Sequence, residues 1–217
     1  MKLEGLKVNF LGDSITSGHG TSAPDKIFHA ILAKKYGFEA RNYGIGGSRI
    51  AKQKNEFFFT EDGTEYSERY KKMKDDADLV VVFGGTNDFG HGDAMMGSFS
   101  DRTNDTFYGA CHTLMQGLIE KYPEARIVFM TPLHRESEDT KGDAIKPAGS
   151  LPLINYVNAI KEVAAYYSLP VLDMWSVSGI QPRVPVIKEK YCPDGLHPND
   201  AGHERMAAVI EGFLLSL

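Results

Sequence analysis

Residues 79–88 read Leu79-Val80-Val81-Val82-Phe83-Gly84-Gly85-Thr86-Asn87-Asp88. The first five residues are apolar without interruption, and the run stops at two glycines. A continuous apolar run of this length is typical of a strand that is buried on both faces, as the strands of a parallel sheet are. The sequence therefore predicts a central parallel strand whose carboxyl end leads into residues 84–88.

Four further segments have the pattern of strands, and stretches with helical spacing separate them. Strands are expected at Lys7–Leu11, Ala40–Tyr43, Arg126–Thr131 and Leu169–Asp173, and helices at Pro24–Tyr36, from Phe107 to near Pro123, at Leu153–Tyr167 and over a last segment that includes Met206–Leu217. Strands that alternate with helices of this length predict right-handed βαβ units. We therefore expect an α/β fold, a three-layer α/β/α sandwich around a five-stranded parallel sheet in flavodoxin-like order.

The chain has 217 residues without an internal repeat, a low-complexity tract or a Pro- or Ser-rich linker. Residues 1–217 are therefore expected to form a single domain. Four stretches are predicted to be irregular, at 48–75, 88–105, 132–150 and 176–193. Loops of this length in a compact domain usually form the walls or lid of a pocket, although the sequence does not show which of them is the lid.

Charge and composition narrow the class of protein. The net charge is −5 and the pI is near 5.8, so we expect no nucleic acid partner and no binding to an anionic membrane. The longest apolar run has five residues, at 79–83, which is too short for a membrane span. Cys111 and Cys192 are expected to be reduced, and residues 1–14 lack the apolar core of a signal peptide. These features predict a cytoplasmic location.

Polar residues gather where the predicted strands end. Four segments carry them, at Gly12–Thr16, Asn42–Ser48, Gly84–Asp88 and, before the last helix, Asp194–Pro198. In open parallel sheets ligands bind outside the carboxyl ends of the strands. A hydroxyl, a flexible glycine backbone, a carboxamide and an Asp–His pair would then share one edge, and together they could carry out nucleophilic acyl transfer.

Each of these groups has a chemical reason to be there. The Ser14 hydroxyl is a weak nucleophile at neutral pH and needs a base, for which the imidazole of His197 is suited. Asp194 lies three residues before His197, close enough for its carboxylate to hold the Nδ1–H and to stabilise the imidazolium. The oxyanion that forms needs hydrogen-bond donors. The Ser14 amide, an amide within Gly44–Gly47 and the Asn87 side chain could supply them.

With these four motifs the sequence resembles the SGNH or GDSL-type hydrolases, a superfamily of serine esterases, acetylesterases and lysophospholipase-like acylhydrolases. The resemblance spans nearly the whole chain and implies Ser14 as nucleophile, with Asp194 and His197 completing the catalytic triad. It also implies an oxyanion hole made of Ser14, Asn87 and the amide of Gly47, with Gly46 as the alternative. The Gly-x-Ser-x-Gly elbow of α/β-hydrolases is absent, because Thr16 stands where its second glycine would be.

The expected activity is that of a serine esterase that hydrolyses small carboxylic esters, O-acetyl groups on a sugar among them, through a covalent acyl-enzyme. Its partner would be a small-molecule ester, with no cofactor and no metal, and the oligomeric state stays open. A thioesterase or a lysophospholipase-like acylhydrolase of the same superfamily is the alternative. A non-catalytic flavodoxin-like binding module is the rival from another class, and the complete Ser–Asp–His set argues against it.

Three other histidines follow predicted strand ends. His19, His91 and His134 are candidates for the walls of the pocket, although solvated loop histidines are the simpler interpretation. His203 and Glu204 do not form a zinc-binding H-E-x-x-H pattern with His197.

Overall fold

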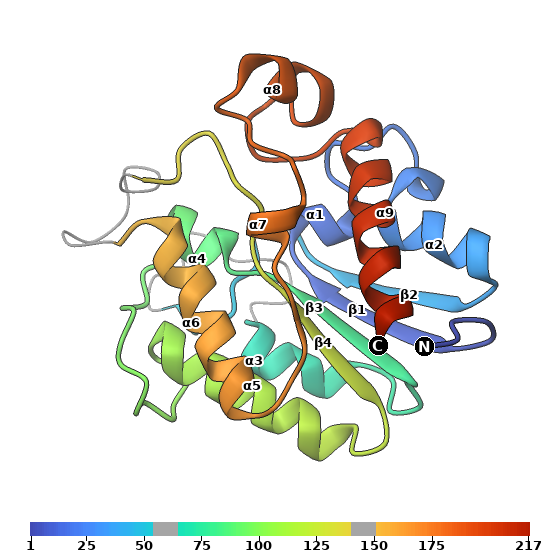
Figure 1. Ribbon diagram of the computed structural model, residues 1–217. Coiled ribbons are helices and arrows are strands. Elements are labelled where there is room, and N and C mark those ends of the chain that lie inside the picture. Colours follow the sequence, from blue (N-terminus) through green and yellow to red (C-terminus); the bar gives the residue numbers. More distant parts are fainter. Residues whose placement is uncertain (54–64, 140–150) are drawn as a thin grey trace.

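The computed structural model describes residues 1–53, 65–139 and 151–217. Within these ranges five parallel strands form one sheet in the order β2-β1-β3-β4-β5 (Figure 1). The strands are β1 (Lys7–Gly12), β2 (Glu39–Gly44), β3 (Leu79–Phe83), β4 (Arg126–Met130) and β5 (Val171–Leu172). This is the flavodoxin-like order, so the predicted fold class is confirmed.

Helices cover both faces of the sheet (Figure 1). One face carries α2 (Phe28–Tyr36) and α9 (Asp200–Ser216), and the other carries α3 (Tyr66–Arg69), α5 (Phe107–Lys121) and α6 (Leu153–Tyr166). Side chains alternate between the faces along β3: Val80 and Val82 pack with α5 and α6, whereas Val81 packs with α2 and α9. All five residues of β3 are buried, as the apolar run predicted.

Short helices occupy parts of the stretches that were predicted to be irregular. They are α3, α4 (Thr86–His91) and α8 (Pro185–Tyr191). The prediction missed them because helices of four to seven residues are too short for a clear apolar stripe, and α8 has no buried residue at all. The remaining short elements are α1 (Ser14–Ser17), α7 (Met174–Val177), η1 (Pro24–Lys26) and η3 (Tyr70–Lys72). Residues 54–64 and 140–150, which belong to two of these stretches, lie outside the described residues.

The helix that was predicted to begin at Pro24 is split. Residues 24–26 form the 3-10 helix η1, and α2 begins only at Phe28 because Ile27 between them is extended, with a ψ of 139°. Strand β5 is shorter than predicted, with two residues. These differences concern element boundaries, where a pattern of apolar residues is least informative.

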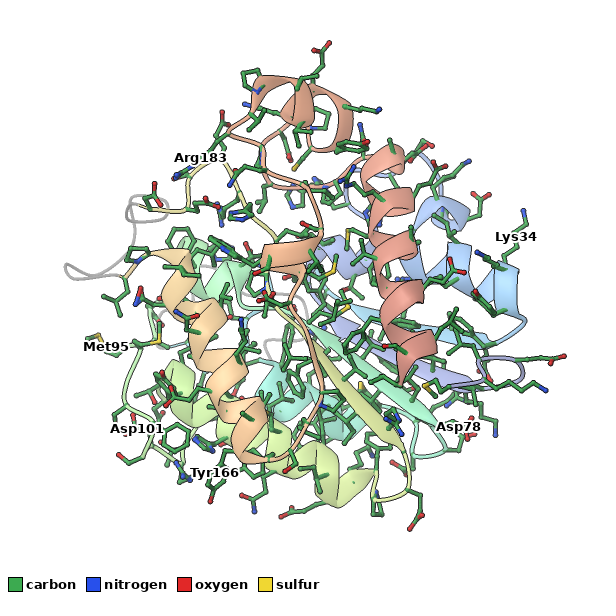
Figure 2. All side chains as sticks on the ribbon, viewed as in Figure 1. Lys34, Asp78, Met95, Asp101, Tyr166 and Arg183 are labelled. Atoms are coloured by element: carbon green, nitrogen blue, oxygen red, sulfur yellow. The ribbon has the colours of Figure 1, made fainter. Side chains whose placement is uncertain are left out.

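Charged side chains tie α8 to the segment that follows β4. Lys188 Nζ lies 2.7 Å from each carboxylate oxygen of Glu136, and Arg183 Nε donates to the Glu136 carbonyl at 3.1 Å. The Arg183 guanidinium also pairs with Asp139, and Figure 2 shows Arg183 beside α8. Helix α8 and the segment after β4 therefore lie together at the carboxyl-end edge of the sheet.

No helix in the described ranges combines the length and the hydropathy that a membrane span requires. Cys111 and Cys192 are both buried and form no disulfide, as predicted.

Two buried histidines connect α2 with its neighbours α1 and α9. His29 of α2 donates from Nε2 to the Thr16 carbonyl of α1 at 3.0 Å, and it is 4% exposed. His203 of α9 is fully buried and accepts the Phe28 amide at Nδ1 over 3.2 Å, so it is neutral in the folded state. Burial lowers the pKa of His203 to about 4.

This burial makes the protein sensitive to acid. In the unfolded chain the imidazole takes up a proton near pH 6.5, whereas folded His203 stays neutral down to a pKa of about 4. The free energy of unfolding should therefore fall as the pH drops from 6.5 to 4, with about 3 kcal/mol from His203. Urea titrations at a series of pH values should show a shallower fall for His203→Gln. His19→Gln, at an exposed position, is the control, and equal slopes for wild type and His203→Gln would contradict the assignment.

Candidate active site

Three strands end level with one another at the edge that carries the predicted site residues. Gly12 of β1 lies opposite Gly44 of β2 on one side and Phe83 of β3 on the other. The serine after β1, the glycine loop after β2 and α4 after β3 therefore leave the sheet side by side. This is the juxtaposition that the sequence predicted.

Ser14 is the first residue of α1, and Asp13 fixes where that helix begins. The Asp13 carboxylate accepts the Ile15 amide at 3.0 Å as an N-cap. The side chain is almost fully buried, which raises the pKa of Asp13 to about 7. Asp13 thus fixes the start of the helix that carries Ser14.

A chain of hydrogen bonds joins the three residues of the predicted triad. Ser14 Oγ lies 3.0 Å from His197 Nε2, and His197 Nδ1 lies 2.6 Å from Asp194 Oδ2. A carboxylate can only accept, so Nδ1 carries the hydrogen and the lone pair of Nε2 faces the serine hydroxyl. The fold thus brings together groups that are 183 positions apart in the chain.

The Asp194 carboxylate is held by the turn that carries the histidine. Its Oδ1 accepts the amides of Leu196 at 2.8 Å and His197 at 2.7 Å. Burial acts to raise the pKa of Asp194, but these hydrogen bonds and the one from the His197 ring outweigh it and lower the pKa. The carboxylate is therefore ionised at neutral pH and can orient the imidazole.

The imidazole of His197 is held in the form that accepts a proton. Burial lowers its pKa, the Asp194 carboxylate acts in the opposite direction, and positive charge on His19 or Arg135 lowers it further. Because the pKa lies below its ordinary value, the ring is neutral at neutral pH. A neutral ring with its lone pair toward a hydroxyl has the protonation state of a general base.

The glycine loop lies against Ser14 on one side and α4 on the other. A Cβ placed on Gly46 would stand 3.9 Å from Ser14 Cβ. A Cβ placed on Gly47, which has a φ of +72°, would stand 4.0 Å from His91 Cε1. Asn87 Nδ2 donates to the Ser48 carbonyl at 3.1 Å. The structure thus places Asn87 beside the loop, while the roles of Asn87 and of the Gly47 amide, or that of Gly46, as oxyanion donors stay predictions.

Helix α4 holds the residues that follow Gly47 through further contacts. The Asp88 carboxylate accepts the amides of Ile50 and Ala51, both at 2.9 Å, and Arg49 Nη1 donates to His91 Nδ1 at 2.9 Å. Helix α4 therefore holds residues 48–51, which directly follow the glycine loop, beside Asn87.

The other candidate histidines also lie near the triad or its loops. The His19 ring lies 4.2 Å from the His197 ring, measured between centroids. His134 lines a small hollow of about 230 Å³, its open mouth included, at the ends of β1, β3 and β4. The hollow is mostly apolar and is lined by Asp13, Ile15, Phe83, Gly84, Thr86, Pro132, Leu133, His134 and Leu196.

One group of side chains in the described part of the chain has the composition of a metal site. Ligand atoms of His19, Asp194 and His197 lie within 4.8 Å of one another. The nitrogens of His197, however, are already engaged with Ser14 and Asp194. A cation there would break the hydrogen-bond chain, so the group does not fit a metal site in this arrangement.

Comparison with known proteins agrees with this geometry. The sequence matches the model of the GDSL-like lipase/acylhydrolase family over residues 10–205. No protein with a curated description matches it.

The fold is similar to several solved structures. A Lactobacillus plantarum protein is 31% identical, with a TM-score of 0.85 over 99% of this chain and 98% of its own. A lipase/acylhydrolase from Enterococcus faecalis is 23% identical, with a TM-score of 0.65 over 96% and 95%. A two-domain esterase active on acetylated mannans is 22% identical, with a TM-score of 0.63 over 99% of this chain and 49% of its own.

The family match extends from β1 into α9 and includes the segments that carry Ser14, Asn87 and His197. The chain therefore belongs to the GDSL-like lipase/acylhydrolase family, whose members hydrolyse esters.

Proposed function

We propose that the protein is a serine esterase that hydrolyses small-molecule carboxylic esters with a short acyl group. The observation that carries the proposal is the hydrogen-bond chain from Ser14 Oγ through His197 to the Asp194 carboxylate. It joins a nucleophile, a base and an orienting carboxylate, which is the arrangement that acyl transfer through a serine requires.

In the acylation step Ser14 Oγ attacks the carbonyl carbon of the ester, and its proton passes to His197 Nε2. The carbonyl electrons move to oxygen and form an oxyanion. When they return, the bond to the alcohol breaks, and the leaving oxygen takes the proton from Nε2. Water then attacks the acyl-serine with the same base, releases the carboxylic acid and restores the Ser14 hydroxyl.

The oxyanion would lie between Ser14, the glycine loop and Asn87. Asn87 is 4% exposed and is fixed at the start of α4, so its carboxamide loses little freedom when charge develops. The second N–H of its amide group is available beside the one that donates to Ser48. A fixed donor of this kind stabilises the transition state more than the neutral ester.

Among esters with a short acyl group, we propose acetyl esters as the substrates. The fold relative that is active on acetylated mannans is consistent with acetyl esters as substrates. Action on a small ester in the cytoplasm, by a single domain, stays a prediction, as does the absence of a cofactor.

Replacement of the nucleophile tests the proposal directly. Ser14→Ala should abolish both the hydrolysis of p-nitrophenyl acetate and covalent labelling by a fluorophosphonate, with a loss of about 10⁶-fold in kcat. Ser17→Ala is the matched control, because Ser17 lies in the same helix and its hydroxyl donates only to the Ser14 carbonyl. The assignment is wrong if Ser14→Ala is labelled like the wild type.

Acyl chain length distinguishes the esterase from the long-chain alternative. If acetyl esters are the substrates, kcat/KM should fall as the acyl group of p-nitrophenyl esters lengthens from acetyl to decanoyl. A rate that rises with chain length would favour the lysophospholipase-like activity, and a preference for acyl thioesters over matched oxygen esters would favour a thioesterase.

The oxyanion assignment predicts a particular kinetic pattern. Asn87→Ala should lower kcat by about 10²–10³-fold with little change in KM, because the lost donor acts on charge that develops in the transition state. Fluorophosphonate should still label this variant, but more slowly, since Ser14 and His197 remain. If KM rose while kcat stayed intact, Asn87 would instead bind the substrate.

A further inference from the structure

The loop that follows α1 is fixed between the nucleophile helix and the histidine turn. At one end the amides of Gly18 and His19 donate to the Ser14 carbonyl at 3.1 and 2.8 Å. At the other end the amide and hydroxyl of Ser22 donate to the Asp200 carboxylate of α9, at 2.8 and 2.6 Å. The position of His19 between these anchors is therefore tied to both halves of the triad.

The same loop packs directly on the turn that carries His197. A Cβ on Gly20 would stand 2.5 Å from the Pro198 carbonyl oxygen and 3.3 Å from His197 Cβ, so only glycine fits there. The φ of Gly20 is +95°, which also favours glycine. With the backbone this close, the His19 ring meets the His197 ring edge to face, at 4.2 Å between centroids and an interplanar angle of 62°.

Three ionisable groups act on the His197 imidazole, each from a different segment. Asp194, in the same turn, stabilises its charged form. His19, in the loop after α1, and Arg135, in the segment after β4, destabilise the charged form when they carry a positive charge. His19 is the one of the three in ring contact with His197, and it is exposed, so it can be replaced without disturbing the core.

From these contacts we infer that His19 is a positioning residue for the base. Its ring holds the His197 imidazole over Ser14, and a positive charge at position 19 makes that imidazole a weaker base. The inference rests on the proposed esterase function, because it assigns a partner to the base of that reaction.

A charge series at position 19 tests both parts. His19→Phe keeps a ring without a charge, His19→Lys keeps a charge without a ring, and His19→Ala removes both. Unit charges about 5 Å apart in water-like surroundings shift each other's pKa by about 0.6 unit. The acid midpoint of kcat/KM for p-nitrophenyl acetate should therefore be lower in His19→Lys than in His19→Phe and His19→Ala.

The ring contact predicts a separate effect on kcat at pH 8. His19→Phe should stay within about 2-fold of the wild type, whereas His19→Ala should lose about 10-fold, because a base that is not held in place is misaligned with the hydroxyl. Lys26→Ala removes a cation from the following helix η1 and is the matched control, which should change neither quantity.

A readout that needs no turnover separates this inference from the proposed function. The titration of the His197 imidazole, followed by NMR in a Ser14→Ala background, should show the same order of midpoints for the series. If the midpoints coincide, or if His19→Ala keeps full kcat, the inference is wrong. A change in KM alone would make His19 a substrate-binding residue and would also overturn it. Failure of the wild type to hydrolyse esters or to react with fluorophosphonate would instead overturn the proposed function.

Discussion

Strand β1 is hydrogen-bonded on both sides, and three of the four segments of the site take their positions from this pairing. Gly12 lies between Gly44 of β2 and Phe83 of β3, so the three chain segments that follow must emerge together. Parallel strands have no alternative, because each of them ends at the same edge of the sheet. The serine, the glycine loop and α4 are therefore adjacent before any contact between their side chains forms.

Short-range hydrogen bonds then set the orientation of each group within its own segment. Asp13 caps the helix that begins with Ser14, and Asp194 accepts the amides of the turn that carries His197. Asp13 is adjacent to Ser14, and Asp194 lies three residues before His197. Each carboxylate fixes the backbone around its neighbour. The pairing of the strands brings the segments together, and the hydrogen bonds within these turns orient each side chain.

The strands and the four motifs of the site could be predicted from the sequence. The contacts between the loops could not, and they share one physical cause. The run at 79–83 predicted a buried central strand, and the Asp194–His197 spacing predicted a pair that meets within one turn, because both are local patterns. Other contacts join residues that are far apart in the chain. The Asp88 carboxylate accepts the amides of Ile50 and Ala51, which lie 38 and 37 positions earlier, and the His19 ring contacts that of His197, 178 positions later. Such contacts depend on how loops pack in three dimensions, for which a single sequence has no periodic signal.

Two buried arginines stabilise the backbone where the strands end. Arg69 donates to the carbonyls of Gly12 and Tyr43, and Arg135 donates to the carbonyl of Thr86, so each guanidinium satisfies backbone groups where a strand has just ended. A guanidinium carries five donors, which suits the irregular carbonyls of such ends better than any neutral side chain does. A buried positive charge needs compensation, and the charge of Arg69 also lowers the pKa of Asp13 against the effect of burial. The cap of α1 and the carbonyls of Gly12 and Tyr43 are therefore stabilised by the same cation, and a change at either would disturb the position of Ser14.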